Sequence, residues 1–478
     1  MNTFIKEYIE EHKEYFQYVS EYIYEHPETR FEEYESASFL AKECENQGFI
    51  VERNIANIPT AFKATYGKGK PVISFLGEFD ALPGLSQVPN ESTYQPLETH
   101  IGHGCGHNLL GTGAFAAACA AKAYLEKHAL PGTVVFLGCP GEEGGSGKTF
   151  MAREGVFNDI DAALTWHPSS GNSIMSLPTL ANYQVAFHFK GVAAHAANSP
   201  HLGRSALDAV ELMNTGANYL REHIVQDARV HYAITDTGGF SPNVVQPNAT
   251  VMYLIRAPKI HQVENIYQRI CKIAKGAALM TETEVTIEFN KACSNYIPNR
   301  KLEAILHQYQ KEVGASIPTK EEEMYAKSIW ETLTEEEQEF YVELMEGFGY
   351  IGDGEEFSGK YLSDDISEYK VMDKLFYGST DVADVSWVVP TAQLTAATST
   401  LGTPLHTWQM TAQGISSFAH KGMLRAATAM ALTGVDLISS KENLANVQKE
   451  HEQFKAKNPY KSPIPNEVKP TTLNGERV

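Results

Sequence analysis

PVISFLG (71–77) and TVVFLG (133–138) are short apolar runs, and the Ala-rich segment GTGAFAAACAAKAYLEKH (111–128) lies between them. Apolar runs of this length are typical of buried strands, whereas the Ala-rich segment is long enough to form a helix. A third apolar run, DAALTW (161–166), follows further along the chain. Strands that alternate with helices predict an α/β fold with an open, mostly parallel sheet.

The sequence pattern changes near residue 183, where YQVAFHFK (183–190) alternates with period two. The segments that follow predict a helix, two strands, a helix and a strand, at residues 203–224, 228–235, 249–256, 260–280 and 283–290. This β-α-β-β-α-β order is typical of a ferredoxin-like module. We therefore expect three parts: residues 1–182, an inserted domain at 183–292, and a return to the first domain at 293–478.

The remaining segments are mostly predicted to be helical. Apolar residues from Phe4 to Ile23 have helical spacing, and a second helix is expected around residues 33–47. Residues 374–398 predict a strand and a loop, residues 411–433 a helix, and the Pro-rich end an extended segment.

Residues 318–350 are expected to form an acidic helical insertion in the C-terminal part of the chain. Thr319 with Glu322, and Thr334 with Glu337, fit the S/T-x-x-E capping box at a helix start. A solvated excursion is the simplest interpretation of an acidic helical pair. A subunit contact or a substrate entrance are the alternatives.

Composition excludes several classes of protein. The 478 residues include 39 Lys and Arg against 59 Asp and Glu, so the formal net charge is −20. Such a surface repels nucleic acids and anionic membranes, and no apolar run approaches the roughly 20 residues of a membrane-spanning helix. The start has no signal-peptide pattern, and the six Cys include no CxxC pair. We expect a cytoplasmic protein that binds neither membrane nor nucleic acid.

Polar residues follow each predicted strand of the first sheet, at the edge where open α/β sheets bind ligands. Glu78 and Asp80 follow the first strand, Glu142 and Glu143 the second, and His167 the third. The loop HIGHGCGHN (100–108) precedes the Ala-rich helix, and His406 comes much later in GTPLHTW.

The loop HGCGHN (103–108) concentrates metal ligands. His103, Cys105 and His107 lie within five residues, and the glycines between them let the backbone curl around a small object. Imidazole and thiolate together suit zinc, and imidazole with carboxylate also suits manganese or cobalt. A Gly-rich loop with incidental histidines is the alternative.

The adjacent acids Glu142 and Glu143 repel each other unless a cation lies nearby. With a metal present, one carboxylate can be a ligand while the other takes the proton from a metal-bound water. Two solvated surface acids are the alternative. A phosphate-binding loop is disfavoured, because its pattern requires Gly five positions before Gly147, where this sequence has Glu142.

The predicted inserted module contributes three further candidates. KGVAAHAANSP (190–200) carries His195, SPNVVQP (241–247) carries Asn243, and the next strand ends near Arg256. Each residue taken alone is ordinary for a surface. As a set, they can supply an oxyanion donor and a clamp for a carboxylate.

Six segments, in order along nearly the whole chain, make this sequence resemble a known family. They are GEFDALPG (77–84), HGCGHN (103–108), PGEEGGSGK (140–148), TWHP (165–168), KGVAAHAANSP (190–200) and SPNVVQP (241–247). The resemblance is to the amidohydrolase branch of the aminoacylase and carboxypeptidase-type metallopeptidases, which includes hippurate, auxin-conjugate and p-aminobenzoyl-glutamate hydrolases. HGCGHN, TWHP and GTPLHTWQMTAQG (402–414) are most similar to the last group.

The resemblance implies a metal-binding α/β domain with an inserted ferredoxin-like lid and dimerisation domain. It implies two divalent ions per chain, manganese or zinc, and assigns each role to residues of this sequence. The ligands would be Cys105, His107, Glu143, His167 and His406. Glu142 would be the general base, His195 would stabilise the oxyanion in a neighbouring subunit, Asp80 would orient a ligand, and Asn243 and Arg256 would hold the substrate carboxylate.

The expected reaction is therefore hydrolysis of the amide bond of an N-acyl amino acid, with p-aminobenzoyl-glutamate as the favoured substrate. An aminoacylase or dipeptidase with another preference, or a metal-binding subunit that needs a paralogous partner, are the alternatives. We expect a homodimer or a dimer with such a paralogue. Two positions depart from the family pattern, since Asn108 and Glu78 each stand where Asp is usual.

Overall fold

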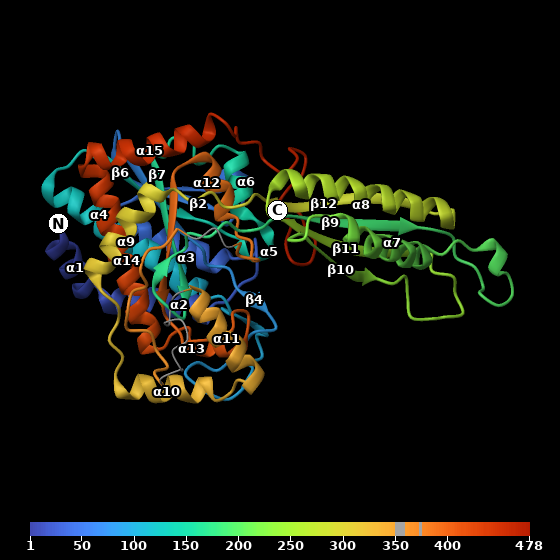
Figure 1. The fold of residues 1–478 in the computed structure, drawn as a ribbon, viewed down its shortest axis with the longest axis horizontal. Helices are drawn as coiled ribbons and strands as arrows, with labels where there is room; N and C mark the ends of the chain where they lie inside the picture. The colour runs from blue at the N-terminus through green and yellow to red at the C-terminus, as the bar shows by residue number, and fades with distance from the viewer. Residues whose placement is uncertain (349–358, 372–374) are drawn as a thin grey trace.

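The computed structural model describes residues 1–348, 359–371 and 375–478, and its central layer is a seven-stranded sheet (Figure 1). The strands in spatial order are β1 (Ile50–Arg53), β2 (Phe62–Lys68), β6 (Gly132–Gly138), β3 (Val72–Gly77), β7 (Ala162–Ser169), β13 (Thr391–Ala397) and β8 (Ser173–Ile174). The central strands β6, β3, β7 and β13 are parallel, whereas the outer strands pair antiparallel. The expected α/β fold with a mostly parallel sheet is confirmed.

Alternate residues of β3 divide between two hydrophobic cores, because successive side chains of a strand point to opposite faces. Ile73 and Phe75 lie in the core shared with α4 (His107–His128) and α14 (Ser417–Ser439). Leu76 lies in the second core, with residues of α6 (Gly147–Arg153) and α12 (Val382–Val388). The sheet is therefore covered on both faces, as expected for parallel strands.

Helix α4 approaches the sheet closely where its residues are glycines. A Cβ on Gly111 would lie 2.5 Å from the carbonyl oxygen of Glu78, and one on Gly113 would lie 2.6 Å from Trp166. Because neither position tolerates a side chain, these glycines let the first turns of α4 lie against the ends of β3 and β7. This packing places the loop before α4 next to both strand ends.

A second, four-stranded antiparallel sheet projects from the first layer (Figure 1). Its elements in chain order are β9 (Ala181–Lys190), α7 (Ala206–Leu220), β10 (Arg229–Asp236), β11 (Asn248–Ala257), α8 (Ile260–Thr281) and β12 (Glu284–Cys293). The spatial order of the strands is β10-β11-β9-β12. On β11, buried Tyr253 faces α7 and donates a hydrogen bond to Asn214 Oδ1 at 2.7 Å. Arg256, of opposite parity on the same strand, points to the other face of the sheet.

The N-terminal region forms two helices rather than the single helix expected from its apolar spacing. Helices α1 (Asn2–Glu11) and α2 (Lys13–Glu25) meet at His12, whose backbone (φ −108°, ψ 12°) is not helical. Helix α3 (Tyr34–Asn46) confirms the next prediction.

Two predictions for the C-terminal part are wrong in detail. Residues 374–398, expected to be strand and loop, contain helix α12 before β13, because Val382, Ala383 and Val385 can bury one helical face. Within this segment, residue 374 lies outside the described residues. The helix expected at 411–433 is divided into α13 (Trp408–Gln413) and α14, and α15 (Lys441–Lys455) follows.

The acidic insertion forms α10 (Lys320–Trp330) and α11 (Glu335–Phe348), which follow α9 (Arg300–Val313). Both expected capping boxes are present as reciprocal hydrogen bonds, and residues 349 and 350 of the predicted insertion lie outside the described residues. The insertion is not simply solvated. Its residues Trp330, Leu333 and Met345 pack against Leu401, close in sequence to His406. Among the described helices, none has the length and apolar character needed to cross a membrane.

Candidate metal centre

The loop before α4 brings two candidate ligands to the edge of the central sheet. Gly106 has a positive φ of 74° and precedes the first helical residue, His107. A Cβ at Gly106 would lie 3.0 Å from Pro168 of β7, so the backbone conformation favours glycine and the tight contact adds to this preference. This loop therefore holds Cys105 and His107 against the end of β7, where His167 lies.

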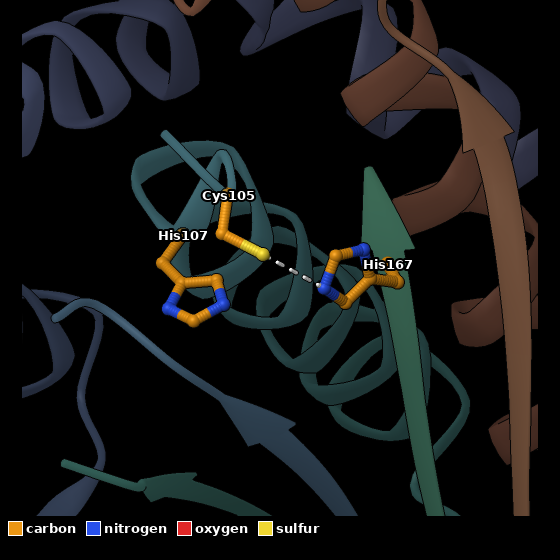
Figure 2. Close-up of side chains that lie close together, drawn as sticks. All are labelled: Cys105, His107 and His167. Carbon is orange, nitrogen blue, oxygen red and sulfur yellow. Dashed lines mark hydrogen bonds between the residues drawn. The ribbon is translucent and has the colours of Figure 1, made fainter. Parts of the chain in front are cut away.

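Cys105, His107 and His167 form a compact group (Figure 2). Cys105 Sγ lies 3.5 Å from His167 Nε2, and the candidate ligand atoms of all three residues lie within 4.8 Å of one another. His107 is fully buried and Cys105 is 7% exposed. These are three of the five ligands expected from the sequence.

The other two expected ligands form a second group that shares Cys105. Glu143 lies in the short segment α5 (Glu142–Gly145) after β6, and its Oε1 lies 3.2 Å from His406 Nε2. The backbone N–H of His406 donates to Gly104 O at 2.8 Å, which ties the His406 loop to the Cys105 loop. Cys105, Glu143 and His406 again place their candidate ligand atoms within 4.8 Å of one another.

Asp80 connects the two groups. Its Oδ1 lies 2.9 Å from His107 Nδ1, and its Oδ2 accepts the backbone N–H of Glu143 at 2.7 Å. A carboxylate on the far nitrogen of an imidazole fixes the ring orientation and makes the other nitrogen a better ligand. The buried Asp80 side chain thus orients one residue of each group.

Glu142 lies beside the groups rather than in either of them. Its carboxylate, Glu78 and His107 place one ligand atom each within 4.8 Å of one another. Burial raises the pKa of Glu142 well above its ordinary value, and the carboxylates of Glu78, Asp381 and Glu143 add to the increase. A carboxyl group with a raised pKa can hold and release a proton, which suits a general acid–base role.

The thiol and carboxyl ligands are held in their charged forms. Burial and the Glu143 carboxylate tend to raise the pKa of Cys105, but His167 and His107 outweigh them and lower it to about 6. Burial also tends to raise the pKa of Glu143, and the hydrogen bond with His406 together with His107 lowers it to about 2. Thiolate and carboxylate are the forms that bind metals.

The geometry and donor set would suit divalent cations held by the two groups of residues, which share Cys105. Two ligands of one tetrahedral ion, with bonds of about 2.1–2.3 Å, lie about 3.4–3.6 Å apart, and the Cys105–His167 and Glu143–His406 distances of 3.5 and 3.2 Å are close to this. Two of the candidate ligand atoms are buried and face charged neighbours: His107 Nε2 lies 3.3 Å from Glu78 Oε2, and Glu143 Oε1 lies 3.2 Å from His406 Nε2. Buried polar atoms need partners, and a bound cation would supply one to each.

Two of the candidates on the second sheet, His195 and Asn243, lie at the end of that sheet far from Arg256. His195 and Asn243 are exposed and lie side by side, because Ala196 N–H donates to Asn243 O and His195 pairs with Val244. Both lie beyond the end of the sheet where Lys190 pairs with Asn248, whereas Arg256 pairs with Asn182 at the opposite end. Eight residue steps of about 3.3 Å separate these ends by roughly 26 Å. Within one chain, Asn243 and Arg256 are therefore not brought together.

Arg256 lies where the second sheet meets the first layer, and its Nη1 donates to Ser379 Oγ at 3.2 Å. No salt bridge pairs Arg256 with a carboxylate in the described parts of the chain. Burial lowers its pKa. A half-buried guanidinium without an acidic partner can bind the carboxylate of a ligand.

Three other residues noted in the sequence do not contribute ligands. Asn108 donates to Ser20 Oγ of α2 and to Gly414 O, so its side chain is directed to these segments and not to the candidate ligands. His103 lies 3.0 Å from Ile23 O, and burial lowers its pKa to about 3. His100 is exposed, in a left-handed conformation.

Sequence reasoning missed the buried charges behind the centre. Lys148 Nζ lies 2.8 Å from Glu78 Oε1 and 2.6 Å from Asp381 Oδ1, and all three side chains are almost completely buried. Lys148 stands in the segment considered as a phosphate-binding loop, and a lysine beside paired acids was the only available signal. Asp381 belongs to no recognisable motif.

The fold agrees with the comparison to known proteins. The family described as Peptidase family M20/M25/M40 matches residues 75–343, and the chain belongs to this family. It is therefore a hydrolase that acts on amide bonds.

Two relatives are similar over most of their length. One subunit of the p-aminobenzoyl-glutamate hydrolase of Escherichia coli (strain K12) is 52% identical over 477 residues, which covers 98% of each protein. A Xaa-Arg dipeptidase of Mus musculus is 30% identical over 455 residues, which covers 92% of this chain and 88% of the relative. Among solved structures, a Bacillus subtilis dinuclear metal binding peptidase of the M20 family shares the fold, with a TM-score of 0.56, 15% identity, and coverage of 90% of this chain and 99% of that one.

Proposed function

We propose that this chain is a dinuclear metal-dependent amidohydrolase that cleaves an N-acyl amino acid, with p-aminobenzoyl-glutamate as the favoured substrate. The observation that carries the proposal is the pair of three-residue ligand groups that share Cys105, with Glu142 beside them. The 52% identical relative supports the choice of substrate. The products are p-aminobenzoate and glutamate.

The proposed ligands of the two ions are Cys105, His107, Glu143, His167 and His406. Imidazole, carboxylate and thiolate together suit zinc or manganese. When bound, such ions polarise the scissile carbonyl and lower the pKa of the attacking water. Asp80 holds His107 and Glu143 in the geometry needed for binding.

Glu142 is the proposed general base. Its carboxylate takes a proton from the attacking water and delivers it to the nitrogen of the leaving amine. The burial that raises its pKa makes the protonated form accessible between these two transfers. This proton delivery matters because an amine leaves poorly as an anion.

Residues 183–292 are proposed to be a ferredoxin-like lid and dimerisation domain inserted between 1–182 and 293–478. His195 of one chain would then donate a hydrogen bond to the oxyanion in the site of its neighbour. Asn243 would also arrive from the neighbour, and together with Arg256 would bind the substrate carboxylate. The neighbour is a second copy or a paralogous chain, because the 52% identical relative is itself one subunit of its enzyme.

A cytoplasmic location is part of the proposal. All six cysteines are free and buried. A reducing compartment keeps such thiols unpaired, and Cys105 must remain a thiolate to bind metal.

The direct test is release of p-aminobenzoate from p-aminobenzoyl-glutamate by the purified chain loaded with manganese. Turnover far above that of a Glu142→Ala control with equal metal content would establish the hydrolase and its base together. Turnover by the Glu142→Ala chain at the wild-type rate would refute the assigned base.

A parallel assay separates the alternatives. N-acetyl amino acids and Xaa-Arg dipeptides test an aminoacylase or dipeptidase preference, and addition of a paralogous chain tests dependence on a partner. Failure of all these substrates, with metal bound and the partner present, would refute the amidohydrolase proposal.

A further inference from the structure

The helix-free face of the second sheet carries two cations at the end that meets the first layer. On β9, Asn182 pairs with Arg256 of β11. Gln184, which points to the same face as Asn182, pairs with Lys291 of β12. Tyr183, of opposite parity, lies in the core formed with α7 and α8, so Arg256 and Lys291 point away from these helices. Strands lie about 4.8 Å apart, which places the two Cα atoms about 12 Å apart, and both side chains are long enough to reach one ligand.

This end of the sheet is joined to the part of the first layer that carries Glu142. Ser294 directly follows β12, and its backbone N–H and hydroxyl group donate to the two oxygens of Asp384 at 2.8 and 2.7 Å. Asp384 also accepts the hydroxyl group of Thr149 on α6 at 2.8 Å. Helix α6 closely follows α5, where Glu142 stands, and lies where the second sheet joins the first layer (Figure 1). The end of β12 that carries Lys291 is therefore held close to the segment of Glu142.

A third cation reaches this segment from the loop between α2 and α3. Arg30 Nη1 donates to the carbonyl oxygen of Gly144 in α5 at 2.6 Å. Burial lowers the pKa of Lys291, and the positive charges of Arg256 and Arg30 lower it further. The negative charge of Glu142 acts in the opposite direction. Because electrostatic interactions weaken with distance, these effects agree with the placement of all three cations near Glu142.

The three cations have no acidic partner in the described parts of the chain. No salt bridge there includes Arg30, Arg256 or Lys291. The Nε atoms of both arginines are buried and make no hydrogen bond with the described residues. This is unexpected in a chain with 59 acidic and 39 basic residues, where carboxylates are in excess. Partly buried like charges repel one another, and a bound anion would compensate them.

The proposed substrate carries two carboxylates on its leaving amino acid. One is bonded to the carbon beside the amide nitrogen, and the other ends the side chain of glutamate. Under the proposed function, Arg256 binds one of them. Arg30 and Lys291 are two further unpaired cations near Glu142, which delivers a proton to the same leaving group. A second carboxylate therefore matches them in charge and in position.

We propose that Arg30 and Lys291 bind the second carboxylate of the substrate, so that the enzyme selects acidic N-acyl amino acids over neutral ones. The inference rests on the proposed function, because it assumes that the leaving amino acid lies beside Glu142. Hydrogen bonds between a cation and a carboxylate are about twice as strong as those between neutral groups. A substrate without the second carboxylate leaves both cations unpaired, and a site built in this way rejects such a substrate.

The test compares two substrates that differ only in this group. In p-aminobenzoyl-glutamine, a neutral amide of nearly the same shape replaces the side-chain carboxylate of p-aminobenzoyl-glutamate. The kcat/KM for each substrate is measured for the manganese-loaded wild-type chain, Lys291→Met and Arg30→Met. Lys272→Met is the matched control, because Lys272 is exposed on α8, which covers the other face of the second sheet. Circular dichroism checks that each variant is folded.

We expect the wild-type chain and Lys272→Met to prefer the glutamate substrate by about 100-fold in kcat/KM, since each hydrogen bond to a charged group contributes about tenfold or more. Lys291→Met and Arg30→Met should each reduce this preference by about tenfold, mainly through a higher KM for the glutamate substrate. A wild-type chain without preference would overturn the inference and leave the proposed function standing. So would equal losses for both substrates in Lys291→Met, because they would show an effect on Glu142 or on folding instead.

A binding measurement separates the inference from the proposed reaction. Calorimetry gives the affinity of the Glu142→Gln chain for the two substrates, with Lys291 intact or replaced by Met. Weaker binding of p-aminobenzoyl-glutamate alone in the double variant supports the carboxylate site, and unchanged affinity overturns it. If the wild-type chain binds both substrates and hydrolyses neither, the proposed function fails and the carboxylate site does not. If it binds neither, both fail.

Discussion

The candidate metal centre and the far end of the second sheet differ in how completely one chain builds them. At the centre, His107 is fully buried and its Nδ1 is held by Asp80, which also fixes Glu143. At the far end of the sheet, His195 is exposed, and its Nδ1 only accepts backbone N–H groups from Ala197 and Asn198. One chain by itself therefore positions the side chains of the candidate centre, whereas exposed His195 has no binding site beside it in the described part of the same chain.

This difference follows from what each region must do. Ligand atoms must be held in position before a cation binds, and only a packed interior holds them there. A residue that acts on substrate bound to another chain must instead remain exposed until the two chains meet. Substitutions in the two regions should therefore have different effects on metal binding and on activity.

The largest effect is expected for Glu142→Gln. Removing the proton acceptor should lower kcat by up to about 10⁴-fold, while both metal ions remain bound because Glu142 lies in neither of the groups that share Cys105. Steady-state kinetics and metal analysis on the same sample provide the measurement. Loss of metal together with activity would make Glu142 a ligand instead.

His195→Ala should lower kcat by about 10²–10³-fold, as removal of one oxyanion donor does. Because the defect lies in the neighbour's site, a mixture with Glu142→Gln chains should regain activity. With random pairing of equal amounts, half of the dimers contain one chain of each variant, and each of these dimers has one intact site of two. The mixture should therefore have about a quarter of the wild-type activity. If dimers shown to contain one chain of each variant did not recover activity, His195 would act in the site of its own chain. One chain would then complete the active site without its neighbour.

Asp80→Asn tests the organisation within one chain. The substitution weakens the hold on His107 and Glu143, and metal affinity should fall by about 10–100-fold. Competition with a chelator of known affinity measures this change. Unaltered affinity would show that packing alone positions the two ligands.

Arg256→Ala should raise KM about tenfold or more, since a hydrogen bond to a charged group contributes about 1.5–3 kcal/mol. The kcat should change little if the contact is equally strong in the ground and transition states. The control substrate is an amide analogue without the carboxylate, whose KM should be the same for both enzymes. An equal increase for both substrates would contradict the assigned role.

The smallest effect is expected at the exposed end of the second sheet. Phe240 is fully exposed, so Phe240→Ser should change the free energy of unfolding by less than about 0.5 kcal/mol. Phe75 of the central core, when replaced by Ala, should cost about 3–5 kcal/mol. Chemical denaturation of dilute protein compares the two. A large loss for Phe240→Ser would mean that this end already packs against another surface.

Much of the centre was predictable because its residues occur in short segments with fixed local geometry. HGCGHN (103–108) supplies Cys105 and His107 through a glycine turn and a helix start, and Glu142, Glu143 and His167 lie at or just after the ends of predicted strands. Parallel strands bring their carboxyl ends to one edge of a sheet. The expected ligands therefore converge without knowledge of the loops between them.

Other features depended on contacts between distant segments. Asp381 lies 233 residues from Lys148, and nothing in its local sequence distinguishes it from a surface acid. The break at His12 and helix α12 likewise depend on tertiary packing, which overrides weak local preferences.

The sequence by itself determined the α/β class, the main strands and helices of the first sheet and the principal candidate metal ligands, because periodicity and short motifs encode local structure. The tertiary structure alone decided which oxygen of Glu78 faces Lys148, which nitrogen of His107 faces Asp80, and that His195 and Arg256 lie at opposite ends of the second sheet. These positions are set by packing between segments that are not neighbours in the sequence, so local sequence patterns do not predict them.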